Sequence, residues 1–197
     1  MTASTAEQWE SRYRSGETGW DRGTASPALD RWLQSGVLAP CRILVPGCGR
    51  GHEVPHLTEL GFDVTAIDIA PSAVSHLEKE LAGSGQTAEV MLGDVLDFEP
   101  EQPFDAVYEQ TCLCALPPEA WPAYEARLHG WLKSGGILAA LFMQTGKDGG
   151  PPYHCDMSGM RALFDDQRWT WPNPETESSR IPHPTGLHEF AYPLRRR

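Results

Sequence analysis

The sequence is short of basic residues and has no hydrophobic run long enough to span a membrane. Lysine and arginine number 16 against 27 acidic residues, which gives a formal net charge of -11 at pH 7. A surface this acidic repels phosphate backbones and anionic lipids. The longest strongly apolar run, 137–143, is far below the roughly 20 residues of a membrane span, and residues 1–16 contain no apolar stretch that would act as a signal peptide. We therefore expect no nucleic acid and no membrane as partner, and residence in the cytoplasm.

The sequence also lacks a metal-binding cysteine pattern. Its five cysteines lie at positions 41, 48, 112, 114 and 155. Cys112 and Cys114 are spaced C-x-C rather than C-x-x-C, and no second pair completes a zinc site. We expect reduced thiols in the core or in pocket walls, and no bound metal.

Strand-like and helix-like segments alternate along most of the chain. Strands are expected over 42–45, 63–67, 88–92, 104–108 and 137–143, and helices over 27–35, 52–60, 72–81 and 118–132. Such alternation predicts a mostly parallel sheet with helices on both faces, a Rossmann-like, doubly wound α/β fold. After residue 153 the pattern weakens: we expect a helix over 157–164, antiparallel edge strands over 169–171 and 189–192, a loop over 171–184, and a solvated tail, 195–197.

A glycine turn follows the first expected strand. Gly47, Gly49 and Gly51 let the backbone turn tightly and bring its amides close to a ligand. A dinucleotide site has the pattern G-x-G-x-x-G, but the last of those positions is His52. The pattern therefore disfavours a pyrophosphate and favours a nucleoside cofactor without one, such as S-adenosylmethionine. Glycine-rich turns also occur as pure structure.

Two carboxylates end the next two expected strands. Asp68 lies twenty-one residues past Gly47, where a carboxylate accepts hydrogen bonds from both hydroxyls of a ribose. Asp94 ends the third strand and is able to accept a hydrogen bond from an exocyclic amine such as that of adenine. Each has a structural alternative: Asp68 as a helix cap, although Ser72 is expected to cap that helix, and Asp94 as the start of a turn before Leu96. Ligands bind at this edge of parallel sheets, so we expect a site there.

Several blocks between residues 9 and 153 match one known group of proteins. They are the N-terminal aromatic residues 9, 13 and 20 and the segments 45–49, 68–74, 111–118 and 149–153. In these blocks the chain resembles class I methyltransferases, and more closely the thiopurine S-methyltransferase superfamily with its thiol, thiocyanate and halide branch. Val45 stands where class I motifs usually begin with an acidic residue, as is common in this superfamily.

The resemblance implies a methyltransferase that uses S-adenosylmethionine. The methyl acceptor would be a small nucleophile (a thiol, thiopurine, thiocyanate, halide, or selenium or tellurium species), attacked in line. The residues that the resemblance assigns to the cofactor are Trp9, Tyr13, Trp20, Gly47, Gly49, Asp68, Ile69, Asp94, Val95 and Gln110. Tyr153 falls on a tyrosine that lines the acceptor pocket. Gln110 replaces a tyrosine of the halide and thiol branch, which argues against a halide because it makes the pocket more polar.

The three N-terminal aromatic residues would form a lid over the cofactor. Trp9 and Tyr13 are one helical turn apart, and Trp20 follows Gly16 and Gly19. Aromatic faces attract the methyl groups of a sulfonium by cation–π interaction. Packing of an N-terminal helix on the sheet is the alternative.

No catalytic triad is visible, and a soft nucleophile needs little or no general base. His154, beside Tyr153, is the histidine to consider as a proton acceptor, and Glu109 as a group that orients the substrate or the cofactor's ammonium. The histidines at 52, 56, 76 and 129 fall in expected helices, where exposed or capping roles are expected.

The expected organisation is a single domain, 1–197, acting as a monomer. It comprises a helical lid (1–40), a cofactor-binding core (41–145) and a region of acceptor site and C-terminal edge strands (146–197). Two other functions stay open: an NAD-dependent oxidoreductase built on the same strand, turn and helix, and a catalytically inactive module that binds S-adenosylmethionine.

Overall fold

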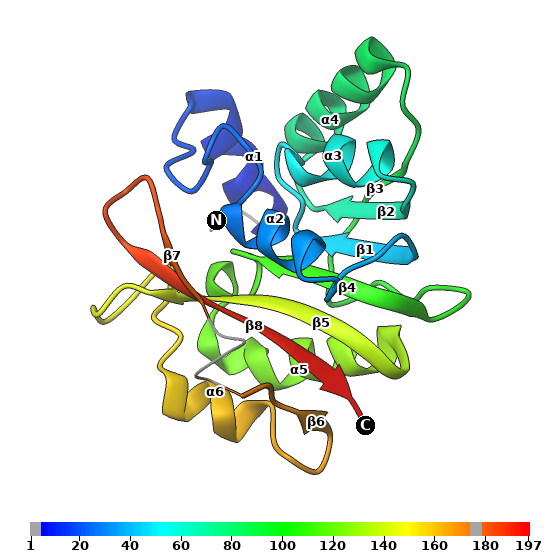
Figure 1. Ribbon diagram of the computed structural model, residues 1–197. Coiled ribbons are helices and arrows are strands. Elements are labelled where there is room, and N and C mark those ends of the chain that lie inside the picture. The colour runs from blue at the N-terminus through cyan, green and yellow to red at the C-terminus, as the bar shows by residue number, and fades with distance from the viewer. Residues whose placement is uncertain (1–4, 174–178) are drawn as a thin grey trace.

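The computed structural model describes residues 5–173 and 179–197, and these form one twisted sheet between two layers of helices (Figure 1). The strand order is β3-β2-β1-β4-β5-β8-β6, and β7 also pairs with β8. The parallel part consists of β1 (Arg42–Pro46), β2 (Asp63–Asp68), β3 (Glu89–Leu92), β4 (Phe104–Gln110) and β5 (Leu132–Gln144). The antiparallel part consists of β6 (Trp169–Thr170), β7 (Ser179–Pro182) and β8 (His188–Arg196). The predicted α/β fold is confirmed.

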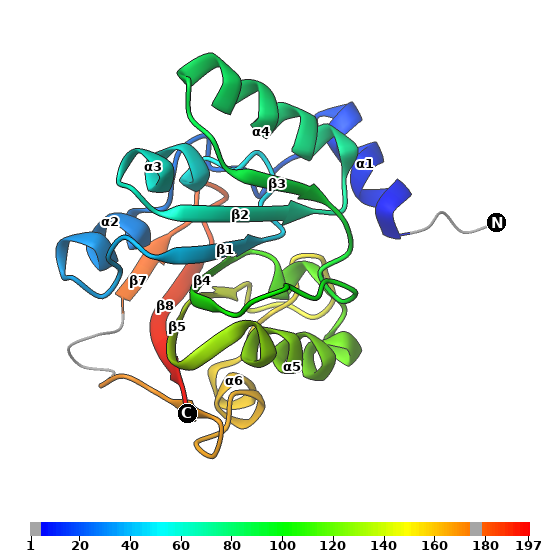
Figure 2. The same ribbon diagram turned by 90° about the vertical axis from the view of Figure 1, so that its right-hand side faces the viewer.

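The helices divide between the two faces of the sheet, as Figure 2 shows from the side. One face is covered by α2 (Pro27–Gln34), α3 (Glu53–Glu59) and α4 (Pro71–Ser84). The other face is covered by α5 (Trp121–Trp131) and α6 (Met157–Leu163). The helix α1 (Thr5–Ser15) has no fully buried residue. Short 3-10 turns, η1 (Leu113–Ala115) and η2 (Pro118–Ala120), lead from β4 into α5. Among the described residues, no helix is long and apolar enough to cross a membrane.

Side chains alternate between the two faces of the sheet from Ala106 to the end of β4, after a shift in register between Phe104 and Ala106. Tyr108 packs with the α2 and α3 layer, whereas Val107 packs with the α5 layer. Since successive side chains of a strand point to opposite faces, Glu109 follows Val107 and Gln110 follows Tyr108. The two adjacent polar residues that end this strand therefore lie on different sides of the sheet.

The cap residue of α2 is the one expected from the sequence, but that of α4 is not. The hydroxyl of Ser26 accepts a hydrogen bond from the amide of Ala28, as expected of a helix cap. Ser72, by contrast, is not the cap of α4, because Pro71 already occupies the first turn and Ala70 is the cap residue. Ser72 instead donates from its amide and its hydroxyl to the carboxylate of Glu10 in α1 (2.9 and 2.7 Å).

The last quarter of the chain is more regular than its sequence indicates. The expected loop over 171–184 contains β7, although residues 174–178 of it lie outside the described part. Arg195 and Arg197 are exposed, as expected of a solvated tail, but their backbone belongs to the fold. Arg195 pairs with Ile137 in the sheet, and the amide of Arg197 donates to the carbonyl of Arg168.

Two element boundaries differ from the expected ones. The strand expected over 137–143 already begins at Leu132, and Gly135 and Gly136 lie inside it. The helix expected over 52–60 ends at Glu59, and Leu60 is 43 % exposed.

Candidate functional site

A cavity of about 440 Å³ lies at the carboxyl ends of the parallel strands. This size is within the range of small-molecule sites. Eight of the residues assigned from the sequence line it, namely Trp9, Tyr13, Trp20, Gly47, Asp68, Ile69, Asp94 and Val95. The ends of three strands and the N-terminal segment therefore meet at one place.

The glycine turn brings the backbone of β1 against the segment after β4. Gly47 and Gly49 both have φ of +58°, a conformation that side chains disfavour. A Cβ atom on Gly47 would lie 2.7 Å from the sulfur of Cys112, and one on Gly49 would lie 3.0 Å from the hydroxyl of Tyr13. Gly47 therefore needs to be glycine for space as well as for backbone conformation, and Gly49 mainly for conformation.

Asp68 holds the turn in place and also faces the cavity. Its two carboxylate oxygens accept hydrogen bonds from the amides of Gly49 (2.8 Å) and Ala70 (2.9 Å), and the residue is 5 % exposed. Burial raises the pKa of this carboxyl, and the two amides oppose the rise. Asp68 thus serves the turn before α4 itself, so the argument that Ser72 relieves it of this role is wrong. Its place on the cavity wall is unaffected.

Asp94, like Asp68, both holds a turn and lines the cavity. Its carboxylate accepts a hydrogen bond from the amide of Leu96 at 2.9 Å, as in the turn considered from the sequence. Asp94 and the buried Val95 also line the cavity. The turn and a contact with a ligand are therefore compatible.

The three aromatic residues of the N-terminal segment form one cluster over the cavity. Trp20 lies edge-on against Trp9 (5.2 Å between ring centroids) and against Tyr13 (5.5 Å). Burial raises the pKa of the Tyr13 hydroxyl, so it stays protonated. The helix α1 is joined to α4 through Glu10 and Ser72 rather than through buried apolar side chains.

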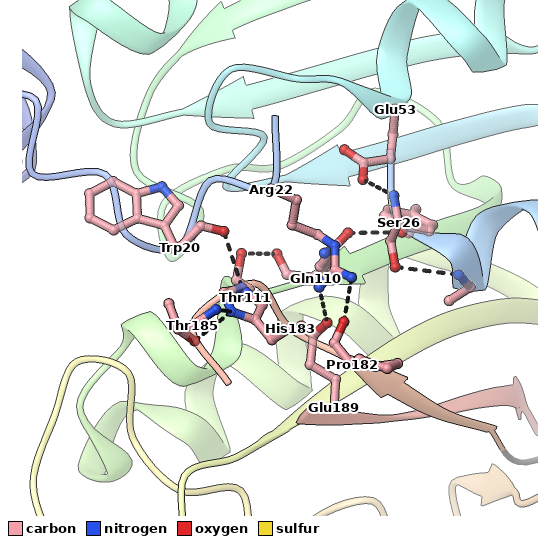
Figure 3. A network of polar contacts seen from close by, with 12 residues as sticks. Trp20, Arg22, Ser26, Glu53, Gln110, Thr111, Pro182, His183, Thr185 and Glu189 are labelled. Atoms are coloured by element: carbon pink, nitrogen blue, oxygen red, sulfur yellow. Dashed lines mark hydrogen bonds and ion pairs between the residues drawn. The ribbon is translucent and has the colours of Figure 1, made fainter. Parts of the chain in front are cut away.

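The segment after α1 is tied to β7 and β8 by the polar network in Figure 3. Arg22 donates to the carbonyl of Pro182 (2.6 Å) and to the buried carboxylate of Glu189 (3.3 Å). The ring of His183 contacts the carbonyl of Trp20 at 3.3 Å. On its other side the segment reaches the glycine turn, where Asp21 lies 2.7 Å from the ring of His52. The lid therefore connects the first strand of the fold with the last.

Five further residues assigned from the sequence do not line this cavity within the described part of the chain. Gln110 lines a smaller adjoining cavity instead and accepts a hydrogen bond from the hydroxyl of Tyr108 (2.9 Å). The ring of Tyr153 packs on Gly150, and its amide donates to the carbonyl of Cys114 (2.8 Å). Neighbouring residues Pro151 and Pro152 occupy the wall instead.

The two residues considered for proton chemistry are also behind the wall. The ring nitrogen Nδ1 of His154 accepts from the amides of Thr145 and Gly146. Glu109 is 1 % exposed, and one of its oxygens accepts from the amide of Leu113 at 2.7 Å. Burial raises the pKa of Glu109 to about 7. Gly49, the remaining assigned residue, supports Asp68 without lining the cavity.

Sequence reasoning missed the opposite wall of the cavity. It is formed by the segment after β4, by the end of β5 and by the turn between β7 and β8, with Thr111, Cys112, Cys114, Leu116, Met143, His183, Thr185 and Leu187. Thr111 has φ of +59°, which is uncommon for a residue other than glycine. A Pro-x-Gly turn signal over 184–186 was available to identify the last part.

The cysteines lie where the sequence suggested. All five are free, and only Cys41 is not buried. Cys112 and Cys114 form part of the cavity wall. Burial raises the pKa of both thiols, so they are poor nucleophiles and serve as apolar wall.

The residues of the cavity fit an adenosyl cofactor. The backbone of Gly47 and the buried carboxylate of Asp68 both line the cavity. The aromatic cluster covers the same part of the cavity with faces suited to a sulfonium.

Comparison with known proteins agrees with this geometry. Residues 4–184 match the family model of thiopurine S-methyltransferase. The chain is 35 % identical over 156 residues to thiocyanate methyltransferase 1 of Brassica oleracea, covering 76 % of this chain and 68 % of the relative. It is 30 % identical over 161 residues to "Probable thiol methyltransferase 2" of Arabidopsis thaliana, covering 80 % and 71 %.

A solved structure supports the fold. It is that of 1,6-didemethyltoxoflavin-N1-methyltransferase from Burkholderia thailandensis with bound S-adenosylhomocysteine. The TM-score is 0.77 at 24 % identity, and the match covers 97 % of this chain and 86 % of the other. Family and fold thus favour S-adenosylmethionine over the nicotinamide cofactor considered from the sequence. The chain belongs to the thiopurine S-methyltransferase family and is an S-adenosylmethionine-dependent methyltransferase.

Proposed function

We propose that the protein methylates small, soft nucleophiles and that thiols are its preferred acceptors. The observation that carries this is the chemistry of the wall that sequence reasoning missed. Cys114, Leu116, Met143 and Leu187 give it apolar and sulfur-containing side chains, to which polarizable sulfur compounds are suited. Relatives named for thiol, thiocyanate and thiopurine methylation support the same class.

The cavity divides into two ends in this proposal. The cofactor end comprises Trp9, Tyr13, Trp20, Gly47, Asp68, Ile69, Asp94 and Val95. Asp68 would accept hydrogen bonds from the ribose hydroxyls, and Asp94 with Val95 would border the adenine. The aromatic lid would cover the sulfonium and exclude water. Gly49 would not touch the cofactor but would position the carboxylate of Asp68 through its amide.

The acceptor end comprises Cys114, Leu116, Met143, Thr185 and Leu187. S-adenosylmethionine supplies an electrophilic methyl group on a sulfonium when bound. The contribution of the chain is to hold the acceptor in line with that methyl group and to keep the site dry.

Residues behind the wall would position others without touching substrate. The backbone hydrogen bond of Tyr153 would keep Pro151 and Pro152 on the wall, and the carboxylate of Glu109 would hold η1 through the amide of Leu113. Gln110 lines the smaller adjoining cavity rather than the acceptor end, so we keep iodide among the candidate acceptors.

We further propose that the chain works as a single domain and as a monomer in the cytoplasm, without nucleic acid as partner. The net charge of -11 supports the last point. The cavity is lined by residues from the expected lid, the cofactor-binding core and the acceptor region, which supports a single domain.

A panel of acceptors tests the proposal. Purified protein is incubated with S-adenosylmethionine and a thiol, hydrosulfide, thiocyanate, iodide, a thiopurine, selenite or tellurite, and formation of S-adenosylhomocysteine is measured. We expect turnover with the thiols and less with the oxyanions. Binding of S-adenosylmethionine by calorimetry without turnover on any acceptor would contradict the proposal and favour an inactive module.

A further inference from the structure

The turn between β7 and β8 places a histidine and a threonine side by side at the acceptor end. His183 is 5 % exposed, and both it and Thr185 line the cavity. The ring nitrogen Nδ1 lies 2.7 Å from the hydroxyl oxygen of Thr185, and Nε2 lies 3.3 Å from the carbonyl oxygen of Trp20 (Figure 3). Both ring nitrogens therefore have a partner.

These partners fix which nitrogen carries the proton. A carbonyl oxygen only accepts hydrogen bonds, so Nε2 donates to Trp20. In the neutral ring Nδ1 is then the acceptor, and it receives hydrogen bonds from the hydroxyl and, at 3.3 Å, from the amide of Thr185. The hydroxyl proton of Thr185 consequently points at His183, and the oxygen lone pairs are free to accept a proton from the cavity.

The surroundings of His183 keep its ring neutral. Burial is the larger cause of its lowered pKa, and the positive charge of Arg22 is the second. The charged groups behind the ring are Arg22, its partner Glu189 on β8, and Glu53 on α3, which interacts with both. A neutral ring with an accepting Nδ1 is the form that takes up a proton.

The turn has backbone hydrogen bonds of its own besides the side-chain pair. The amide of His183 donates to the carbonyl of Leu187 (2.9 Å), and the amide of Gly186 donates to the carbonyl of His183 (3.0 Å). None of the backbone hydrogen bonds of the turn uses the hydroxyl of Thr185, so this hydroxyl is available for another role.

We propose that Thr185 and His183 accept the proton of protonated acceptors, which makes the protein selective for thiols over anions that carry no proton. This inference rests on the proposed function. As the acceptor sulfur forms its bond to the methyl carbon, the bond between that carbon and the sulfonium sulfur breaks. The S–H proton moves to the oxygen of Thr185 while the hydroxyl proton of Thr185 moves to Nδ1 of His183. The products are a neutral methyl sulfide, neutral S-adenosylhomocysteine and an imidazolium, which later releases its proton to water.

Thiocyanate provides the internal control because it is already an anion at neutral pH. His183→Gln keeps hydrogen-bonding groups on this side chain but removes the base. We expect the ratio of thiol to thiocyanate turnover at pH 7 to fall by about 100-fold, as for loss of a general base. The thiol rate of the variant should recover as the pH rises through the pKa of the thiol itself.

Two Thr185 variants complete the test. Thr185→Val should lower the same ratio, and Thr185→Ser should restore it, since serine keeps the hydroxyl. Equal losses on thiol and thiocyanate in His183→Gln and Thr185→Val would overturn the proton-accepting role and leave a purely structural one. If the wild-type protein turned over neither acceptor, the proposed function itself would fail. Affinity for S-adenosylhomocysteine, measured by calorimetry, verifies that each variant is folded.

Discussion

The cofactor end of the cavity is built from strand ends that follow one another along the chain, whereas the acceptor end joins distant segments. Gly47 follows β1, Asp68 ends β2 and Asp94 follows β3, and the two carboxylates accept hydrogen bonds within their own turns or from the preceding one. At the acceptor end, Cys114, Met143 and Thr185 come from the segment after β4, the end of β5 and the turn between β7 and β8. Local turns thus fix the first end, and long-range packing fixes the second. Four substitutions test this difference.

Gly47→Ala should have the largest effect. A positive φ costs a side chain about 1–2 kcal/mol, and the new Cβ would lie 2.7 Å from the sulfur of Cys112, which adds about 1–3 kcal/mol of overpacking. Gly36→Ala is the matched control, because Gly36 has a positive φ but no heavy atom nearby. Calorimetry should show that only the first variant loses affinity for S-adenosylmethionine. Equal losses would mean that the approach of Gly47 to Cys112 does not matter.

Asp68→Ala should weaken cofactor binding by about 1–3 kcal/mol, since it removes a charged acceptor from the turn and from the ribose position. Asp63→Ala, at the exposed start of the same strand, is the control and should leave the affinity unchanged. The KM for the thiol should change little in either variant. A large rise in that KM with unchanged cofactor affinity would place Asp68 at the wrong end of the cavity.

Glu109→Gln should stabilise the fold at alkaline pH by about 1–2 kcal/mol. Burial raises the pKa of Glu109 from 4.5 to about 7. The protonated form is favoured in the fold, so its contribution to stability is full below pH 4.5 and is lost as the pH rises through 7. The variant escapes this loss, although its buried amide offsets part of the gain. Urea unfolding at pH 5 and pH 8, with the exposed Glu119→Gln as control, measures the difference. Parallel curves for wild type and Glu109→Gln would contradict the burial argument.

Trp20→Leu should have the smallest effect, a loss of about 0.5–1 kcal/mol in affinity for S-adenosylmethionine. Leucine keeps apolar cover but removes the aromatic face that contacts the sulfonium in the proposal. S-adenosylhomocysteine has no positive charge on sulfur, so its affinity should fall less. Trp20→Phe should retain the preference for the charged ligand. Equal losses of affinity for the two ligands would mean that the lid only shields the ligand from water and makes no cation–π contact.

The sequence predicted the parallel strands, the helices between them and most of the cofactor end. These features depend on apolar periodicity and on glycine and carboxylate positions that act locally. Ser72 was misplaced because its partner, Glu10, is 62 residues away. β7 was missed because the prolines around it predict a loop and because the strand is defined by its pairing with β8. Tyr153 was assigned to the acceptor pocket by resemblance, but its amide anchors the segment and leaves the wall to two prolines. Tertiary pairing of this kind leaves no periodic trace in a single sequence.

The position of β8 bears on the order in which the protein folds. This late strand lies between β5 and β6 and pairs with residues 137–144 of β5. Long-range pairing of this sort is slow because the intervening chain must be closed first. The first four strands and their turns are able to form while the chain is still being made. A nascent chain would then hold the strand-end part of the cofactor site before the segment that completes the acceptor end and anchors the lid is made.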